Sequence, residues 1–165
     1  MNRVAAITVI LVVLVGMAIF LWSPRRQAAP LQPIAFSHKV HTGDNRIACQ
    51  YCHLYTTRST VAGVPAVQIC MGCHEVISKD QPEVRKLRGY WDRESPIAWV
   101  KVYDLPDFVY FSHKPHVRKG ISCETCHGAV ASMDRVRKVV SLDMGWCVSC
   151  HQAKQASVDC LVCHK

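Results

Sequence analysis

The sequence lacks features that would place it in several common classes of protein. No βαβ pattern accompanies its Cys-x-x-Cys pairs, which argues against a thioredoxin-like redox motif. No nucleic-acid-binding motif accompanies its formal charge of +8, and the basic residues are scattered rather than clustered, so this charge does not predict DNA binding. The chain also has no Ser/His/Asp or other general-base arrangement, so the sequence does not indicate hydrolytic catalysis.

No cysteine lies outside one short pattern. All ten cysteines of the 165-residue chain belong to five copies of Cys-x-x-Cys-His, the attachment site of a c-type haem. In such a site two thiols form thioethers with the porphyrin vinyl groups, and the histidine that follows becomes the proximal iron ligand. The pattern therefore predicts five covalently attached haem c groups and no disulfides. The thioether cysteines are Cys49, Cys52, Cys70, Cys73, Cys123, Cys126, Cys147, Cys150, Cys160 and Cys163, and the proximal ligands are His53, His74, His127, His151 and His164.

A zinc site is the main alternative for a Cys-x-x-Cys pair. Zinc needs four ligands and no fixed histidine directly after the second cysteine, whereas every pair here is followed by histidine. Haem therefore explains the pattern better, and two propionates on each haem would offset much of the basic excess. Thioether attachment takes place on the outer side of a bacterial membrane, so we expect the motifs on the periplasmic side.

Residues 1–23 are predicted to be a single transmembrane anchor in the bacterial inner membrane. The run from Val4 to Trp22 has no charged side chain, and its 19 residues would make roughly 28 Å of helix, close to the hydrocarbon thickness of a bilayer. A cleaved signal peptide is the alternative, but its apolar region is usually only about 7–15 residues long. Residues 24–33, rich in Pro, Ala and Gln, are predicted to be a tether.

An internal repeat divides the remaining chain. The element Phe-Ser-His-Lys-x-His begins at Phe36 and again at Phe111, and each copy lies shortly before a haem motif. We therefore predict a two-haem module with a haem-free insertion over residues 34–110 and a three-haem module over residues 111–165. The expected fold class is a multihaem cytochrome c, mostly loops and short α-helices around five covalent haems.

Regular structure is otherwise expected to be sparse. Each haem motif should lie on a loop or a short helical turn. Residues 75–89 have helical composition, and Pro82 either interrupts that helix or starts a second one. Residues 96–110 are rich in β-favouring side chains, although Pro106 limits any strand there to a sheet edge. Residues 137–140 suggest either a short helix or a short strand. Porphyrins should replace much of the core, so the chain without haem is not expected to fold.

Counting ligands predicts that the irons are fully coordinated. Five irons need ten axial ligands, and the chain has nine histidines. The four outside the haem motifs are the predicted distal ligands His38, His41, His113 and His116. One position is left for a methionine thioether, a common ligand in c-type cytochromes. Met133 and Met144 are both feasible, whereas Met71 is held between two motif cysteines.

The segment from Phe111 to His164 resembles the triheme cytochromes of the c7 class, through its aromatic-x-His-x-x-His element and its three haem motifs. In that family a late histidine precedes the second motif, and here Met144 stands in its place. The resemblance implies the ligand pairs His113 with His127, His116 with His151 and Met144 with His164, and the repeat extends this to His38 with His53 and His41 with His74. A methionine ligand would make the last haem the one of highest potential.

The whole chain also resembles the membrane-anchored pentahaem subunit of alternative complex III, a quinol-oxidising assembly. Shared features include the segments Gln32–His41, Asp104–Tyr110 and Met144–Cys147, several of which also occur in the multihaem subunit of menaquinone reductase complexes. The resemblance implies three kinds of partner: an iron–sulfur/molybdopterin-like subunit, polytopic quinone-binding membrane subunits and a monohaem cytochrome c subunit. The expected function is electron transfer from quinol to a periplasmic acceptor or an oxidase, by a subunit that is not itself catalytic. A quinol dehydrogenase of the NapC/NrfH type is an alternative, and a catalytic multihaem reductase is a third that would need a five-coordinate iron.

Overall fold

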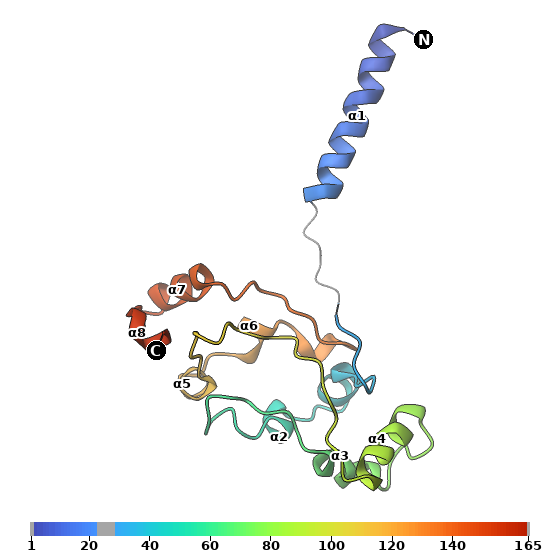
Figure 1. Cartoon of the computed structure of the whole chain (residues 1–165), viewed down its shortest axis with the longest axis vertical. Coiled ribbons are helices and arrows are strands. Elements are labelled where there is room, and N and C mark those ends of the chain that lie inside the picture. Colours follow the sequence, from blue (N-terminus) through green and yellow to red (C-terminus); the bar gives the residue numbers. More distant parts are fainter. Residues whose placement is uncertain (1, 23–28, 165) are drawn as a thin grey trace.

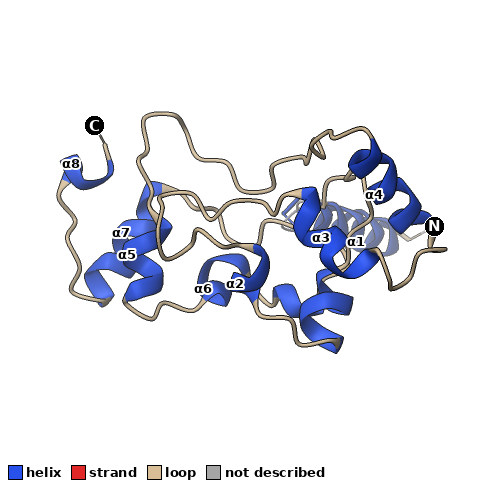
Figure 2. Cartoon of the chain, turned by 90° about the horizontal axis from the view of Figure 1, so that it is seen from below, coloured by secondary structure: helices blue, strands red, loops and turns tan. Residues whose placement is uncertain are grey.

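The structure is a computed structural model that describes residues 2–22 and 29–164 (Figure 1). Within these residues it consists of helices and loops, without a strand (Figure 2). The described elements are α1 (Arg3–Trp22), the π-helix η1 (Lys39–Asp44), α2 (Cys49–Cys52), α3 (Val67–His74), α4 (Pro82–Asp92), α5 (His113–Arg118), α6 (Cys123–His127), the 3-10 helix η2 (Val130–Ser132), α7 (Met144–Ala153) and α8 (Cys160–Cys163).

Helix α1 coincides with the apolar run noted in the sequence. It is 20 residues long, and its described side chains, those of residues 8–17, are all exposed. Over residues 2–22 and 29–164 together, no helix meets the combined length and apolarity needed to cross a membrane. The anchor over residues 1–23 therefore stays a prediction. The tether predicted over residues 24–33 lies partly outside the described residues.

Every haem motif lies on a helix, as the sequence predicted. Three of these helices begin with a side chain that caps a backbone N–H group: the Ser122 hydroxyl accepts from Glu124 at 3.3 Å, the Asp143 carboxylate from Trp146 at 2.7 Å and the Asp159 carboxylate from Leu161 at 2.8 Å. Such caps satisfy amide groups that have no partner within the helix. These caps help to fix the start of the three helices that carry the motif cysteines.

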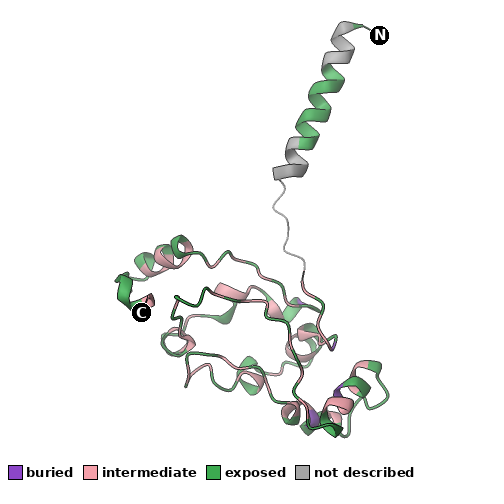
Figure 3. Ribbon diagram, viewed as in Figure 1, coloured by how far each residue is buried: buried purple, intermediate pink, exposed green. Residues whose placement is uncertain are grey.

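The apolar core is very small. Four apolar side chains are buried among the described residues, and Figure 3 shows that the rest of the described chain is half-buried or exposed. Ile34, Met71 and Leu87 form one cluster, which joins α3 to α4, and Met133 is buried separately. A core of this size is far below what a chain of this length ordinarily buries, in agreement with the expectation that haem replaces apolar side chains.

Pro82 starts a helix rather than interrupting one. Helix α3 ends at His74, and α4 begins with Pro82 at its first turn, where a missing N–H group costs nothing. The second of the two alternatives for residues 75–89 is therefore correct. Helix α4 packs against α3 and carries Leu87 into the small core.

The β-favouring residues 96–110 form a loop, so the expectation of an edge strand is wrong. Their backbone groups form isolated hydrogen bonds instead of the regular series that joins two neighbouring strands. The Gln32 side chain both donates to and accepts from the backbone of Val100, and the Tyr110 N–H donates to the carbonyl of Cys163 at 2.8 Å. Residues 137–140 are likewise irregular, neither helix nor strand.

Contacts cross the boundary between the two predicted modules. The Ser37 hydroxyl bonds to the Asp134 carboxylate at 2.8 Å, and the Lys39 N–H donates to the carbonyl of Met133 at 3.0 Å. These bonds hold η1 of the first module against η2 of the second. The repeat units are therefore interleaved rather than joined end to end.

Candidate haem sites

The ten cysteines are spread over five helices, α2, α3, α6, α7 and α8. The histidine of each motif either ends its helix or follows directly after it. His74, His127 and His151 lie within α3, α6 and α7, whereas His53 and His164 cap α2 and α8. One helical turn thus presents two thiols and one imidazole together, which is the arrangement that covalent haem attachment requires.

The remaining four histidines lie on two further short helices. His38 caps η1 and His41 lies inside it, while His113 and His116 both lie in α5. A spacing of three residues places two helical side chains on neighbouring positions of one face. Each Phe-Ser-His-Lys-x-His element therefore presents two imidazoles from one turn of helix.

The phenylalanine of each element sets the orientation of its two imidazoles. Phe111 lies edge-on to His113 at 4.8 Å between ring centroids, and Phe36 lies edge-on to His38 at the same distance and the same angle of 86°. The same rings lie more nearly parallel to the second histidine, at 4.2 Å for Phe36 with His41 and 4.7 Å for Phe111 with His116. The sequence repeat is therefore also a repeat of geometry, and the two phenylalanines are positioning residues that the sequence alone did not assign.

The rings of three predicted ligand pairs lie close to each other. Their ring centroids are separated by 6.1 Å for His41 and His74, 6.4 Å for His113 and His127, and 5.8 Å for His116 and His151, with planes inclined by 63°, 8° and 43°. Two metal–nitrogen bonds of about 2 Å each, plus about 1 Å from nitrogen to ring centre at both ends, give a separation of about 6 Å. The observed spacing fits one iron between the rings of each pair.

Most of the imidazoles also form a hydrogen bond through Nδ1, which orients a histidine that binds a metal through Nε2. Seven of the nine place Nδ1 within 2.6–3.2 Å of a backbone carbonyl oxygen: His41 on Ser37, His53 on Gly63, His74 on Ile77, His113 on Thr60, His116 on Ser112, His151 on Ser157 and His164 on Phe108. An Nδ1–H group that donates to a carbonyl fixes the tautomer and leaves Nε2 for the metal. The chemistry of this donor set fits haem iron.

The fourth pair, His38 and His53, has a different environment. The Nδ1 atom of His38 is buried and has no hydrogen-bond partner among the described residues. Burial, followed by the nearby charges of His53 and His41, lowers the pKa of His38 from its ordinary value of 6.5 to about 4. The imidazole is therefore neutral at physiological pH, which is the form that binds a metal.

The predicted tenth ligand is less clearly placed. Met144 is the first residue of α7 and its side chain is 65% exposed, whereas Met133 is 6% exposed and Met71 is 2% exposed in the core. The ring of His164 lies against that of Phe108, at 5.9 Å between ring centroids. The choice of Met144 over Met133 as the tenth ligand stays a prediction.

Aromatic residues of the haem-free stretch reach two proximal histidines. The ring of Tyr103 lies edge-on to His127 at 4.5 Å, and its hydroxyl donates to the carbonyl of Arg137 at 3.2 Å. Burial raises the pKa of Tyr103, so its hydroxyl stays protonated. The ring of Phe108 is more nearly parallel to that of His164, at 5.9 Å and 28°.

Thiols of different motifs lie close to one another around α2. Burial raises the pKa of Cys52, and the neighbouring Cys73 raises it further. Burial also raises the pKa of Cys123, with a smaller contribution from Cys49, whose thiol is within hydrogen-bonding reach. Helix α2 therefore lies between α3 on one side and α6 on the other.

The same pattern links the C-terminal motifs. Burial, followed by the charges of Cys150 and Cys147, raises the pKa of Cys126. Burial and then the charge of Cys163 raise the pKa of Cys147. Helix α7 thus lies between α6 and α8.

Comparison with known proteins identifies the family. A family model described as "Cytochrome c7 and related cytochrome c" matches residues 109–165. The multihaem cytochrome c subunit of a menaquinone reductase from Nitratidesulfovibrio vulgaris is 31% identical, in an alignment that covers 81% of this chain and 77% of the relative. The chain belongs to the multihaem cytochromes c. Covalent haem c and a role in electron transfer follow from that membership.

Proposed function

We propose that this multihaem cytochrome carries five haem c groups and transfers electrons as one subunit of a membrane-bound quinone oxidoreductase complex. The observation that carries the proposal is the set of three facing histidine pairs, each separated by about the distance that one iron needs. Each haem supplies a one-electron couple when bound, and the protein sets its potential through the axial ligands and their hydrogen bonds.

The residues of the chain bind and insulate the haems without forming a substrate site. Two imidazoles facing each other occupy both axial positions, so no position is left for nitrite or peroxide in those sites. The proposed ligand set is His38 with His53, His41 with His74, His113 with His127, His116 with His151, and Met144 with His164. The last pair rests on the c7 resemblance and on the exposed thioether of Met144.

Menaquinone reductase is the complex that the relative supports, because 31% identity extends over most of both chains. Alternative complex III is the second candidate, supported by the shared segments from Gln32 to His41 and from Asp104 to Tyr110. In either setting the partners would be an iron–sulfur/molybdopterin-like subunit, polytopic quinone-binding subunits and, in alternative complex III, a monohaem cytochrome c. A quinol dehydrogenase of the NapC/NrfH type would instead act without such subunits.

We place the haem domain on the periplasmic side of the inner membrane, with residues 1–23 as a single-pass anchor. The support comes from the charge-free run of Val4 to Trp22 and from the chemistry of thioether attachment, which takes place outside the cytoplasm. The N-terminus would then lie in the cytoplasm.

Purification in mild detergent, followed by identification of the co-migrating proteins, tests the proposal. We expect an iron–sulfur subunit and a polytopic subunit to remain bound, and a monohaem cytochrome to co-migrate only if the complex is an alternative complex III. A chain that purifies alone yet reduces a soluble reductase directly from quinol would refute it in favour of the NapC/NrfH type. A high-spin haem that binds nitrite would instead indicate a catalytic reductase.

A further inference from the structure

We propose that the five haem motifs form one unbranched row whose spatial order differs from their order in the chain. Each motif is named by its first cysteine. The Cys49 motif lies between the Cys70 and Cys123 motifs, and the row continues through the Cys147 motif to the Cys160 motif. The inference rests on the proposed function, because it names the two ends where electrons would enter and leave. In chain order the Cys49 motif would be an end.

The arrangement of the motif helices supports a single row. In Figure 1 and Figure 2, α3 lies towards one end of the haem domain and α8 lies at the other, with α2 and α6 near each other between them and α7 next to α8. The two views differ by 90°, so the succession of α3, α2 with α6, α7 and α8 is not an effect of overlap in one projection. The first motif in the sequence is therefore placed near the middle.

The contact between the Cys49 and Cys123 motifs is built from backbone as well as side chains. Both the N–H group and Nδ1 of His113, the predicted distal ligand at the Cys123 motif, bond to the carbonyl of Thr60, at 3.0 Å and 2.9 Å. Thr60 lies in the loop that follows α2. Cys49 also contributes to the raised pKa of Cys123, as expected of neighbouring thiols. The two bonds to Thr60 thus join motifs that are separated in sequence by the Cys70 motif.

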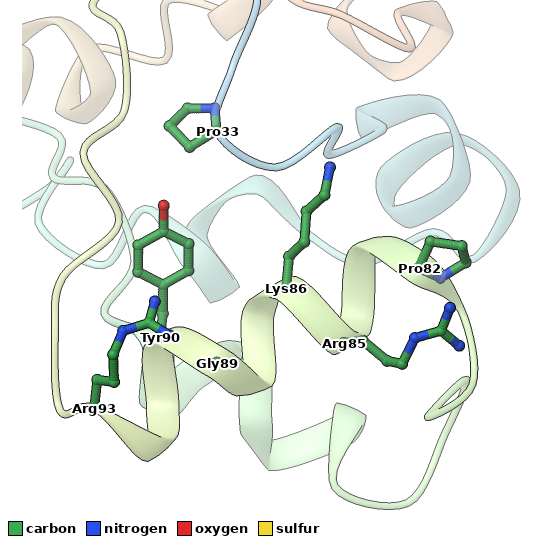
Figure 4. A pocket seen from close by; sticks show the side chains of 7 residues that line it. All are labelled: Pro33, Pro82, Arg85, Lys86, Gly89, Tyr90 and Arg93. Atoms are coloured by element: carbon green, nitrogen blue, oxygen red, sulfur yellow. The ribbon is translucent and has the colours of Figure 1, made fainter.

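The Cys70 motif is the end on the other side of α2. The thiols of this motif have Cys52 as their neighbour from another motif. Helix α3 also packs on α4, a helix without a haem motif. A cavity of about 540 Å³ opens on α4 and is lined by Pro33, Pro82, Arg85, Lys86, Gly89, Tyr90 and Arg93 (Figure 4). Three of its lining residues are cationic, and one of them, Lys86, pairs with Glu83 at 2.6 Å.

The Cys160 motif is the end beyond α7. Its Cys163 thiol adjoins Cys147, while its backbone and its imidazole bond to the haem-free loop through Tyr110 and Phe108. The haem-free loop therefore contacts α8 and the histidine that follows it. The row accordingly has two ends, at α3 and at α8, and the insertion between the modules contacts both of them.

Substituting one distal ligand at a time in the holoprotein tests this order. A methionine in place of a distal histidine raises the potential of that haem, and the altered charge acts on its nearest neighbours, because Coulomb interactions weaken with distance. The midpoint of each haem is followed through its methyl signals in NMR redox titrations. We expect His41→Met to shift the midpoints of the Cys70 and Cys49 haems and to leave the Cys123 haem unchanged. His113→Met should shift the Cys123, Cys49 and Cys147 haems. Val40→Met, which adds the same side chain between two ligands without changing the charge, should shift none.

A row in chain order would give a different result. The Cys70 haem would then lie between the other two, so a shift of the Cys123 haem in His41→Met equal to that of the Cys49 haem would overturn the proposal. If a variant fails to fold, nuclear Overhauser contacts in the unsubstituted protein decide the same question: contacts between the Cys49 and Cys123 haems support the order, and contacts between the Cys70 and Cys123 haems refute it. Fewer than five haems, or a high-spin iron, would refute the proposed function separately.

Discussion

Replacing His113 by alanine should leave one haem iron with a single imidazole. The ring of His113 faces that of His127 across 6.4 Å, with planes only 8° apart. The other three distal histidines are committed elsewhere: His41 and His116 face rings of their own, and His38 adjoins His53. No other distal histidine is therefore positioned to replace the lost ligand, and the ferric iron should become high-spin.

The size of the effect follows from the number of motifs. One haem motif out of five corresponds to one fifth of the total iron, so the high-spin signal should account for one fifth of the haem. The fold should survive, since the backbone N–H of residue 113 keeps its bond to the carbonyl of Thr60. Loss of the Nδ1 bond to the same carbonyl should cost about 0.5–1.5 kcal/mol in free energy of unfolding.

Electron paramagnetic resonance of the oxidised protein measures this change, with the high-spin signal integrated against total haem. Lys114→Ala, the adjacent position on the same helix, is the matched control and should stay fully low-spin. An unchanged low-spin spectrum in His113→Ala would show that His113 is not a ligand. Conversion of two fifths of the iron would refute the one-to-one pairing of histidines.

Four further outcomes follow from the same geometry. Met144→His should lower the highest midpoint potential, and the assignment of Met144 opposite His164 fails if every midpoint stays where it was. Met133→Leu should cost less than about 1.5 kcal/mol in thermal unfolding and change no potential, because that side chain is buried in packing. Chain produced without haem attachment should give the circular dichroism spectrum of an unfolded protein, since only four apolar side chains are buried among the described residues. The pKa of His38 is lowered from 6.5 to about 4 in the folded protein, so between these pH values the unfolded chain binds more protons than the folded protein. The stability measured by thermal melting should therefore fall as the pH drops from 6.5 to about 4. It should fall less in His38→Met.

Much of the haem site was predictable because its chemistry is local in sequence. Two cysteines and a histidine within five residues must share one helical turn, and a second imidazole three residues from the first must share a face with it. The pairing of His113 with His127 and of His116 with His151 came from resemblance to the c7 class, and the structure brings both pairs together. Local spacing, the repeat and the family resemblance together gave this level of detail.

The features that the sequence did not predict depend on groups that every residue has. The partners of the imidazoles are backbone carbonyls, such as those of Thr60 and Gly63, and a carbonyl leaves no mark in the sequence. The loop over residues 96–110 was mistaken for an edge strand because Val, Tyr and Phe there favour a pleated surface, yet no second strand lies beside it. The spatial order of the motifs was also out of reach, because it depends on how α2 meets α6.

The three-haem module illustrates how these long-range contacts limit an argument from family resemblance. The family model begins at residue 109, as if the C-terminal third of the chain were a unit of its own. Three of its histidines nevertheless depend on residues before that point: His113 bonds to Thr60, His127 lies against Tyr103, and His164 bonds to the carbonyl of Phe108. Since each contact orients an iron ligand, a fragment containing only this module would keep its haem motifs but lose the groups that aim their imidazoles. The haem-free insertion thus contacts predicted ligands of both modules, because Ile77 bonds to His74 in the first module just as Tyr103 and Phe108 contact His127 and His164 in the second.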